Sequence, residues 1–215
     1  MANMKLISLL SGGIDSAVSS YMFIKKGIDV IFVHFHNQTI QKKYVENKVV
    51  KIAQILAKFS KKETKLYLIP FKELQHEIIK TVPADVRMIV YRRIMFRIAD
   101  EILKKEGAKA LVTGDNIGQV ASQTLDNLNV IHDAAKHPVL TPLLGMDKID
   151  IIKRAQEIGT FESSILPYSD CCSYLIAKHP QTKSKLSEIK EIEQKANLEG
   201  PIKEAMEKAR IIPLP

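Results

Sequence analysis

The sequence predicts an α/β protein with a doubly wound, parallel β-sheet, and three observations lead to this prediction. Short apolar runs, typical of strands buried on both faces, alternate along the chain with segments of helical spacing. The helical segments are long enough to connect parallel strands by right-handed crossovers. Glycine follows several of them, as it often does where a helix ends.

The elements can be placed in order from apolar spacing and from glycine and proline. Strands are expected at residues 6–10, 30–33, 66–69, 110–113 and 139–141. Helices are expected at residues 17–26, 43–59, 88–106 and 147–158. Residues 160–180 have a loop-like composition, and residues 184–210 have helical spacing with a break at Gly200 and Pro201. We therefore predict a sheet domain at residues 1–180 and a lysine-rich helical C-terminal extension at residues 181–215.

Composition limits the class of protein. The 215 residues include 46% hydrophobic and 26% charged residues, which is ordinary for a globular domain. No run approaches the roughly 18 apolar residues of a spanning helix, and the N-terminal run leads into a turn instead of a signal cleavage site. We expect a cytoplasmic protein without a membrane partner. The net charge is 32 − 24 = +8, which favours anionic partners but also fits a lysine-rich solvated surface.

The two cysteines, Cys171 and Cys172, are neighbours. Adjacent residues cannot join distant segments, so a disulfide-based scaffold is excluded. Two sulfurs also cannot build a four-cysteine zinc or iron–sulfur site, and no metal site is expected. His34 and His36 share one face of a strand, but no further cysteine or histidine cluster supports metal binding.

Residues 11–16, Ser-Gly-Gly-Ile-Asp-Ser, carry the most information. They follow the first strand and open the first helix, where backbone N–H groups and the helix N-terminus can bind a phosphate. A carboxylate repels phosphate, so Asp15 fits this loop if it coordinates Mg²⁺ on that phosphate. The alternative is a plain turn in which Asp15 caps the helix. The loop is neither a Walker motif nor a dinucleotide fingerprint.

A second polar cluster follows the fourth predicted strand, at residues 113–124. Topology places it at the same sheet edge as the first loop. Gly114 and Gly118 allow a close backbone approach, and Gln119, Ser122 and Gln123 can hydrogen-bond a nucleotide. The alternative is an ordinary loop whose polar residues cap the next helix.

The first loop resembles the pyrophosphate loop (PP-loop) of the ATP pyrophosphatases, which have an adenine nucleotide alpha hydrolase-like fold. Together with other motifs it resembles the tRNA 4-thiouridine synthetase (ThiI) family. The supporting segments lie in the family's order at residues 33–36, 92–95, 118–124, 142–148, 158–160 and 167–172. The resemblance implies that residues 1–180 form a PP-loop sulfurtransferase domain. It implies that ATP adenylates a tRNA uridine and that a cysteine persulfide then replaces the carbonyl oxygen with sulfur.

The resemblance also implies roles for single residues. The expected ATP-binding residues are Leu9, Leu10, Ser11, Gly12, Gly13, Asp15, Ser16, His34, Phe35, Arg92, Gly114 and Gln123. Lys148 is expected to stabilise charge during adenylation. Cys172 matches the persulfide carrier, in a loop that its composition predicts to be exposed, and Cys171 is either the carrier or a resolving thiol that forms a vicinal disulfide.

The chain departs from the family pattern at its ends. The family's N-terminal RNA-binding THUMP region and the rhodanese domain of some relatives are not expected here. Sulfur is then expected from a cysteine desulfurase or from sulfide, with tRNA bound directly or through a separate THUMP-bearing partner. A homodimer also fits. Glutamates alternate with lysines in the tail, which favours a solvated helical face over an RNA-binding one.

Two other functions stay open. One is sulfur transfer to a carrier protein for the thiamine thiazole. The other is a nucleotide-binding subunit that has little activity without its partner.

Overall fold

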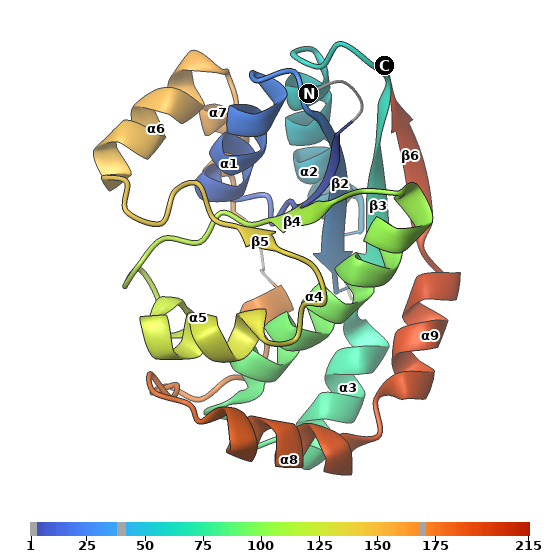
Figure 1. The fold of residues 1–215 in the computed structure, drawn as a ribbon, viewed down its shortest axis with the longest axis vertical. Helices are drawn as coiled ribbons and strands as arrows, with labels where there is room; N and C mark the ends of the chain where they lie inside the picture. Colours follow the sequence, from blue (N-terminus) through green and yellow to red (C-terminus); the bar gives the residue numbers. More distant parts are fainter. Residues whose placement is uncertain (1–3, 38–41, 168–170) are drawn as a thin grey trace.

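A computed structural model describes residues 4–37, 42–167 and 171–215, and within them six strands form one sheet in the order β5-β4-β1-β2-β3-β6 (Figure 1). The strands are β1 (Lys5–Leu9), β2 (Asp29–His36), β3 (Thr64–Pro70), β4 (Ala110–Val112), β5 (Val139–Leu140) and β6 (Arg210–Leu214). β1 to β5 pair in parallel, whereas β6 pairs antiparallel with β3. The predicted doubly wound α/β fold is confirmed, but the sheet is mixed and not parallel throughout.

Helices cover both faces of the sheet (Figure 1). One layer contains α1 (Ile14–Ile24), α2 (Lys42–Ala57), α6 (Lys148–Glu157) and the short α7 (Phe161–Ser164). The other contains α3 (Lys72–Thr81), α4 (Arg87–Glu106), α5 (Leu125–His132), α8 (Leu186–Ala196) and α9 (Glu199–Glu207). Among the described residues, no helix has both the length and the apolar character needed to cross a membrane.

The central strands are buried on both faces, as their continuous apolar runs predict. Along β2, Phe32 packs into the core beneath α1 and α2, while its neighbours Ile31 and Val33 pack into the core beneath α4. These three side chains are at most 5% exposed. The alternation of side chains along a strand therefore joins the two helical layers through the sheet.

Four elements were not predicted: three helices and one strand. α3 and α5 lie in segments for which no helix was predicted, and the short α7 forms in the predicted loop at residues 160–180. The predicted break in the tail is present, but it lies at Asn197 and Leu198, between α8 and α9. Gly200 and Pro201 follow it in the first turn of α9, where proline costs no hydrogen bond. The predicted helical extension at residues 181–215 also contributes the edge strand β6.

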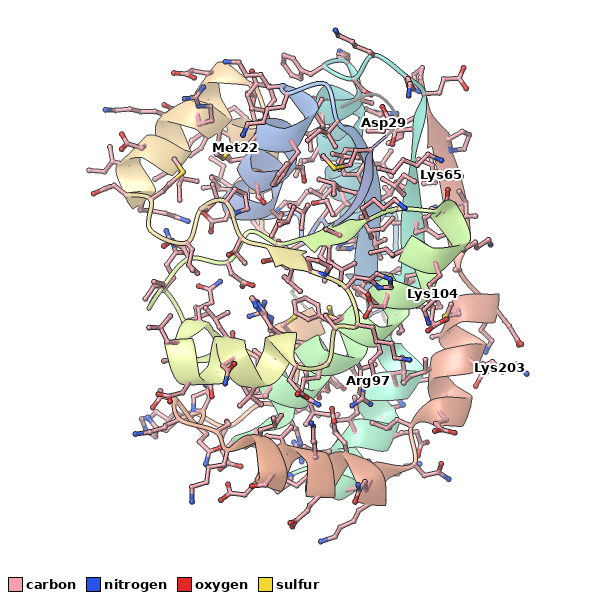
Figure 2. The ribbon with its side chains drawn as sticks, in the orientation of Figure 1. Met22, Asp29, Lys65, Arg97, Lys104 and Lys203 are labelled. Atoms are coloured by element: carbon pink, nitrogen blue, oxygen red, sulfur yellow. The ribbon has the colours of Figure 1, made fainter. Side chains whose placement is uncertain are left out.

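The tail is attached to α4 through a buried carboxylate. Glu193 of α8 accepts hydrogen bonds from Arg93 Nε at 2.9 Å and Nη2 at 3.1 Å, and it also pairs with Arg97. Figure 2 shows Arg97 on α4, on the side of the molecule where α8 and α9 pack. Asp133 lies 3.3 Å from Arg93 Nη1. Glu193 therefore does not belong to the solvated face that we expected for the tail.

Replacing Glu193 with alanine is expected to lower the free energy of unfolding by about 3–5 kcal/mol, because Arg93 would then be a buried charge without its main partner. Urea unfolding followed by circular dichroism measures this change. The paired replacement Arg93→Met with Glu193→Leu should recover most of the loss. A paired variant as unstable as Glu193→Ala would contradict the assignment.

Candidate functional site

A cavity of about 400 Å³ opens at the carboxyl ends of β1, β2 and β4. β1 lies between β2 and β4, so the direction in which successive strands are added reverses at this point. Ligands of doubly wound sheets bind at such a reversal, and the volume lies in the range of small-molecule sites. The fold therefore places the cavity where the sequence predicted a nucleotide site.

The cavity brings together most of the residues that the sequence singled out. It is lined by Leu9, Leu10, Ser11, Gly13, Asp15, Ser16, His34, Phe35, Arg92, Gly114, Gln123, Cys171 and Cys172. Among the predicted ATP-binding and catalytic residues, Gly12 and Lys148 are outside this lining. Gly12 lies behind the loop, where an added Cβ would be 3.0 Å from Val49 Cγ2. Its φ of +87° also favours glycine.

Serine side chains hold the loop at residues 11–16 in shape. Ser16 Oγ accepts a hydrogen bond from Ser11 N at 3.2 Å and donates one to Gly13 O at 3.1 Å, while Gly13 N donates to Ser11 Oγ at 3.2 Å. α1 begins at Ile14 without a side-chain cap, so its first backbone N–H groups are available at the cavity. The loop can bind an anion with backbone donors.

Gly114 allows the loop after β4 to lie directly on the start of α1. A Cβ added at Gly114 would lie 2.5 Å from Ser16 N and 2.7 Å from Asp15 C. Ser19 Oγ donates a hydrogen bond to Thr113 O at 2.7 Å beside this contact. The two predicted motifs therefore meet backbone to backbone.

Lys148 forms an ion pair with Asp15, which lines the cavity. Lys148 Nζ lies 2.6 and 2.7 Å from the two carboxylate oxygens of Asp15, and 3.4 Å from Gln119 Oε1. The lysine side chain is 42% exposed, so the pair contributes little to stability. Both charges can therefore change partners when a ligand enters.

A buried carboxylate, Asp115, organises the floor of the cavity. Arg92 Nη2 donates to its two oxygens at 2.7 and 2.6 Å, Thr113 Oγ1 donates at 2.8 Å, and Gln123 Nε2 donates at 3.2 Å. Burial raises the pKa of Asp115, but the Arg92 guanidinium and these hydrogen bonds outweigh it and hold the pKa well below its usual range. Arg92, predicted to bind phosphate, is here held by Asp115.

His34 is neutral in this site. Its Nδ1 lies 2.8 Å from Leu10 O, which fixes the proton on Nδ1 because a carbonyl oxygen only accepts. Burial lowers the pKa of His34 to about 4, although the bond to Leu10 opposes the shift.

No group of three or more cysteine, histidine or carboxylate residues capable of holding a metal occurs in the described ranges.

The two cysteines line the same cavity as the loop at residues 11–16. Both are free thiols: Cys171 is buried with its Sγ 3.5 Å from Phe35 O, and Cys172 is half-buried with its Sγ 3.8 Å from Met95 Sδ. The prediction of an exposed cysteine loop is wrong at Cys171, because that side chain packs into the core beneath α4. Residues 168–170 of the predicted motif lie outside the described residues.

Sequence reasoning missed Asp115 and Thr113 as functional candidates, although both belong to the second motif. The sequence did contain a signal for Asp115. It is an acidic residue shortly after a predicted buried strand, at the sheet edge where ligands bind. The apolar side chains of Met88, Met95 and Ile176 also line the cavity and were missed. Nothing in the spacing of these residues distinguishes them from residues of the core.

Comparison with known proteins gives a consistent result. Residues 2–198 match the family described as thiamine biosynthesis protein (ThiI). Probable tRNA sulfurtransferases from Acetivibrio thermocellus and Thermus thermophilus are 44% and 42% identical over 211 and 208 residues. These alignments cover 98% and 97% of this chain but 54% and 51% of the relatives. The chain thus spans about half the length of the curated relatives it matches.

Two solved structures support the fold. A 4-thiouridine synthetase, crystallised with RNA and bound ATP, superposes with a TM-score of 0.92 at 39% identity, over 99% of this chain and 55% of that one. An NMN synthetase from Francisella tularensis superposes with a TM-score of 0.54 at 13% identity, over 94% of this chain and 82% of that one. The second likeness concerns the fold alone.

Gly114→Ala is expected to lower the free energy of unfolding by about 1–3 kcal/mol, because the new methyl group would push the loop after β4 away from the start of α1. Thermal unfolding measures the effect. Gly145→Ala is the matched control, since no atom lies within 4 Å of a Cβ added there. Equal melting temperatures for the two variants would disprove the close approach.

The depressed pKa of His34 predicts a pH dependence of stability. Between the ordinary value of 6.5 and about 4, the unfolded chain takes up a proton at this site and the folded chain does not. The neutral His34 side chain therefore contributes to the free energy of unfolding at neutral pH. This contribution is lost as the pH falls, by about 3 kcal/mol in total. His34→Asn keeps a donor for Leu10 O, and urea unfolding at several pH values should show the stability advantage of the wild type shrinking from pH 7 to pH 4. A difference independent of pH would contradict the assignment.

Proposed function

The chain belongs to the ThiI family, and from that premise we propose that it is an ATP-dependent tRNA sulfurtransferase that forms 4-thiouridine. The observation that carries this proposal is the single cavity lined both by the loop at residues 11–16 and by the two free thiols. Adenylation of the uridine oxygen and sulfur attack on the adjoining carbon concern the same carbonyl group, so the two steps need one shared space. The activities for which the relatives are named agree with this chemistry.

The residues around the cavity fit ATP. The N-terminus of α1 and the N–H groups of the loop at residues 11–16 would bind phosphate oxygens. The buried strand end at His34 and Phe35 would meet the adenine, and Gln123 Oε1, which is buried and has no hydrogen-bond partner among the described residues, can accept from an N–H group. Asp15 would hold Mg²⁺, which would neutralise phosphate charge when bound.

Lys148 performs the electrostatic part of the first step. The uridine carbonyl oxygen attacks the α-phosphorus of ATP, a P–O bond to that oxygen forms, and the bond to pyrophosphate breaks. Lys148, released from Asp15, would stabilise the charge that builds on the phosphoryl oxygens. The step turns the carbonyl oxygen into a good leaving group, namely AMP.

The cysteines perform the second step. A cysteine desulfurase, or sulfide directly, supplies the sulfur. In the persulfide route, the terminal sulfur on Cys172 attacks the activated carbon and AMP leaves. The Cys171 thiolate then attacks Cys172 Sγ, which releases the thiouridine and leaves a disulfide between the two cysteines. An external thiol reduces that disulfide for the next cycle.

The test measures the two steps separately on purified protein with ATP, Mg²⁺, tRNA and a cysteine desulfurase with cysteine. Lys148→Ala should slow tRNA-dependent pyrophosphate release by about 100-fold, the loss typical of a removed transition-state donor. Cys172→Ser should release pyrophosphate normally but form no thiouridine, as judged by absorbance. Lys153→Ala, an exposed change on the same helix, is the control and should leave both steps unchanged.

Other outcomes of the same experiment would distinguish the proposed function from the two alternative functions. Pyrophosphate release that requires the C-terminus of a sulfur-carrier protein instead of tRNA would replace the proposal with a role in thiazole synthesis. Release that requires an added THUMP-domain protein would assign RNA binding to that partner. ATP binding without release under any of these conditions would contradict the proposal.

A further inference from the structure

We propose that Gln75, Arg87 and Tyr91 are positioning residues that hold the cysteine turn, defined here as residues 171–175, in the geometry needed for sulfur transfer. The three side chains come from α3 and α4 and donate to backbone carbonyls of this turn. The inference rests on the proposed function, because it assigns them to the second step of that reaction and not to the first.

Each side chain contacts a different carbonyl. Gln75 Nε2 donates to Cys171 O at 2.6 Å, Tyr91 Oη donates to Tyr174 O at 3.2 Å, and Arg87 Nη1 donates to Leu175 O at 2.7 Å. These partners lie far along the chain from the turn. Because the contacts are made to the backbone, they fix the path of the turn irrespective of its side chains.

Arg87 is itself held rigidly. Its Nε donates to Val82 O at 2.9 Å and its Nη2 donates to Ile79 O at 3.2 Å, so two of its donors fasten it to the end of α3. The third donor reaches Leu175, whose φ of +50° lies in the left-handed region that leucine seldom adopts. Such a conformation persists only where the surroundings impose it. The Arg87 guanidinium is one such contact, because it holds the carbonyl group of Leu175.

Gln75 is an unusual residue for its position. It is completely buried, and its Oε1 has no hydrogen-bond partner among the described residues. An apolar side chain of similar size would fill this space without leaving a polar atom unpaired. The amide is explained by what its Nε2 does, which is to hold the carbonyl of Cys171.

The held turn sets the places of both sulfurs. Cys171 Sγ lies against Phe35 O and Cys172 Sγ against Met95 Sδ, both on the wall of the cavity. Gln75, Arg87 and Tyr91 do not line that cavity, so they have no contact with the proposed nucleotide position. Loss of one of them should therefore move the sulfurs and leave nucleotide activation intact.

The experiment compares Gln75→Met and Tyr91→Phe with the wild type. Both variants keep the volume of the side chain, and the phenylalanine keeps the edge-on contact of the ring with Phe71. Thr64→Val is the matched control, because it also removes a buried donor to a backbone carbonyl, that of Val30, far from the turn. The readouts are tRNA-dependent pyrophosphate release, thiouridine formation, and the alkylation rate of Cys172 by iodoacetamide in a Cys171→Ser background.

We expect thiouridine formation to fall by about tenfold in both variants, with pyrophosphate release within about twofold of the wild type, because a small displacement of a reacting atom slows only the step in which it acts. The alkylation rate of Cys172 should shift by about threefold or more, and Thr64→Val should change none of the three readouts.

Unchanged alkylation in both variants, or equal losses of pyrophosphate release and thiouridine formation, would overturn the inference. A wild-type chain that released no pyrophosphate with tRNA would refute the proposed function instead. The alkylation rates would still decide whether Gln75 and Tyr91 position the turn.

Discussion

The rest of the site depends on the close approach of two backbone segments, the loop after β4 and the start of α1. Gly114 lies so near Asp15 and Ser16 that no side chain larger than a hydrogen atom fits between them. Because of this contact, the loop after β4 cannot shift without moving the start of α1. Asp115 follows directly and holds Arg92 and Gln123, while Lys148 reaches Asp15 from α6. One contact between main chains thereby sets the relative positions of residues from α1, α4, α6 and the loop after β4.

The ion pairs of the molecule fall into two kinds. The pairs of Arg92 with Asp115 and of Arg93 with Glu193 are nearly inaccessible to water, so breaking either leaves a charge without compensation. The pair of Lys148 with Asp15 is partly hydrated and can be exchanged at small cost. The buried pairs keep the scaffold in one arrangement, and the hydrated pair lies where partners have to change during a reaction.

Much of the fold and of the candidate site could be predicted from the sequence, because both depend on local patterns. Apolar runs and the glycines at residues 27, 107 and 159 located the strands and helices, and residues 11–16 located the cavity. The missed features depend on contacts between distant segments. Nothing local distinguishes Glu193 from its solvated neighbours, since its burial depends on Arg93, and β6 forms only because β3 offers it an edge. Cys171 lies in a polar segment, yet it packs beneath α4.

The antiparallel strand β6 has a consequence for how the protein is made. Its residues pair with β3 across more than half of the chain, so the sheet is completed only after the residues between these two strands have all been synthesised. Until then β3 presents an unpaired edge, which is a template for association with other nascent chains. Chaperone dependence during synthesis should accordingly be concentrated in the interval between the synthesis of β3 and that of β6.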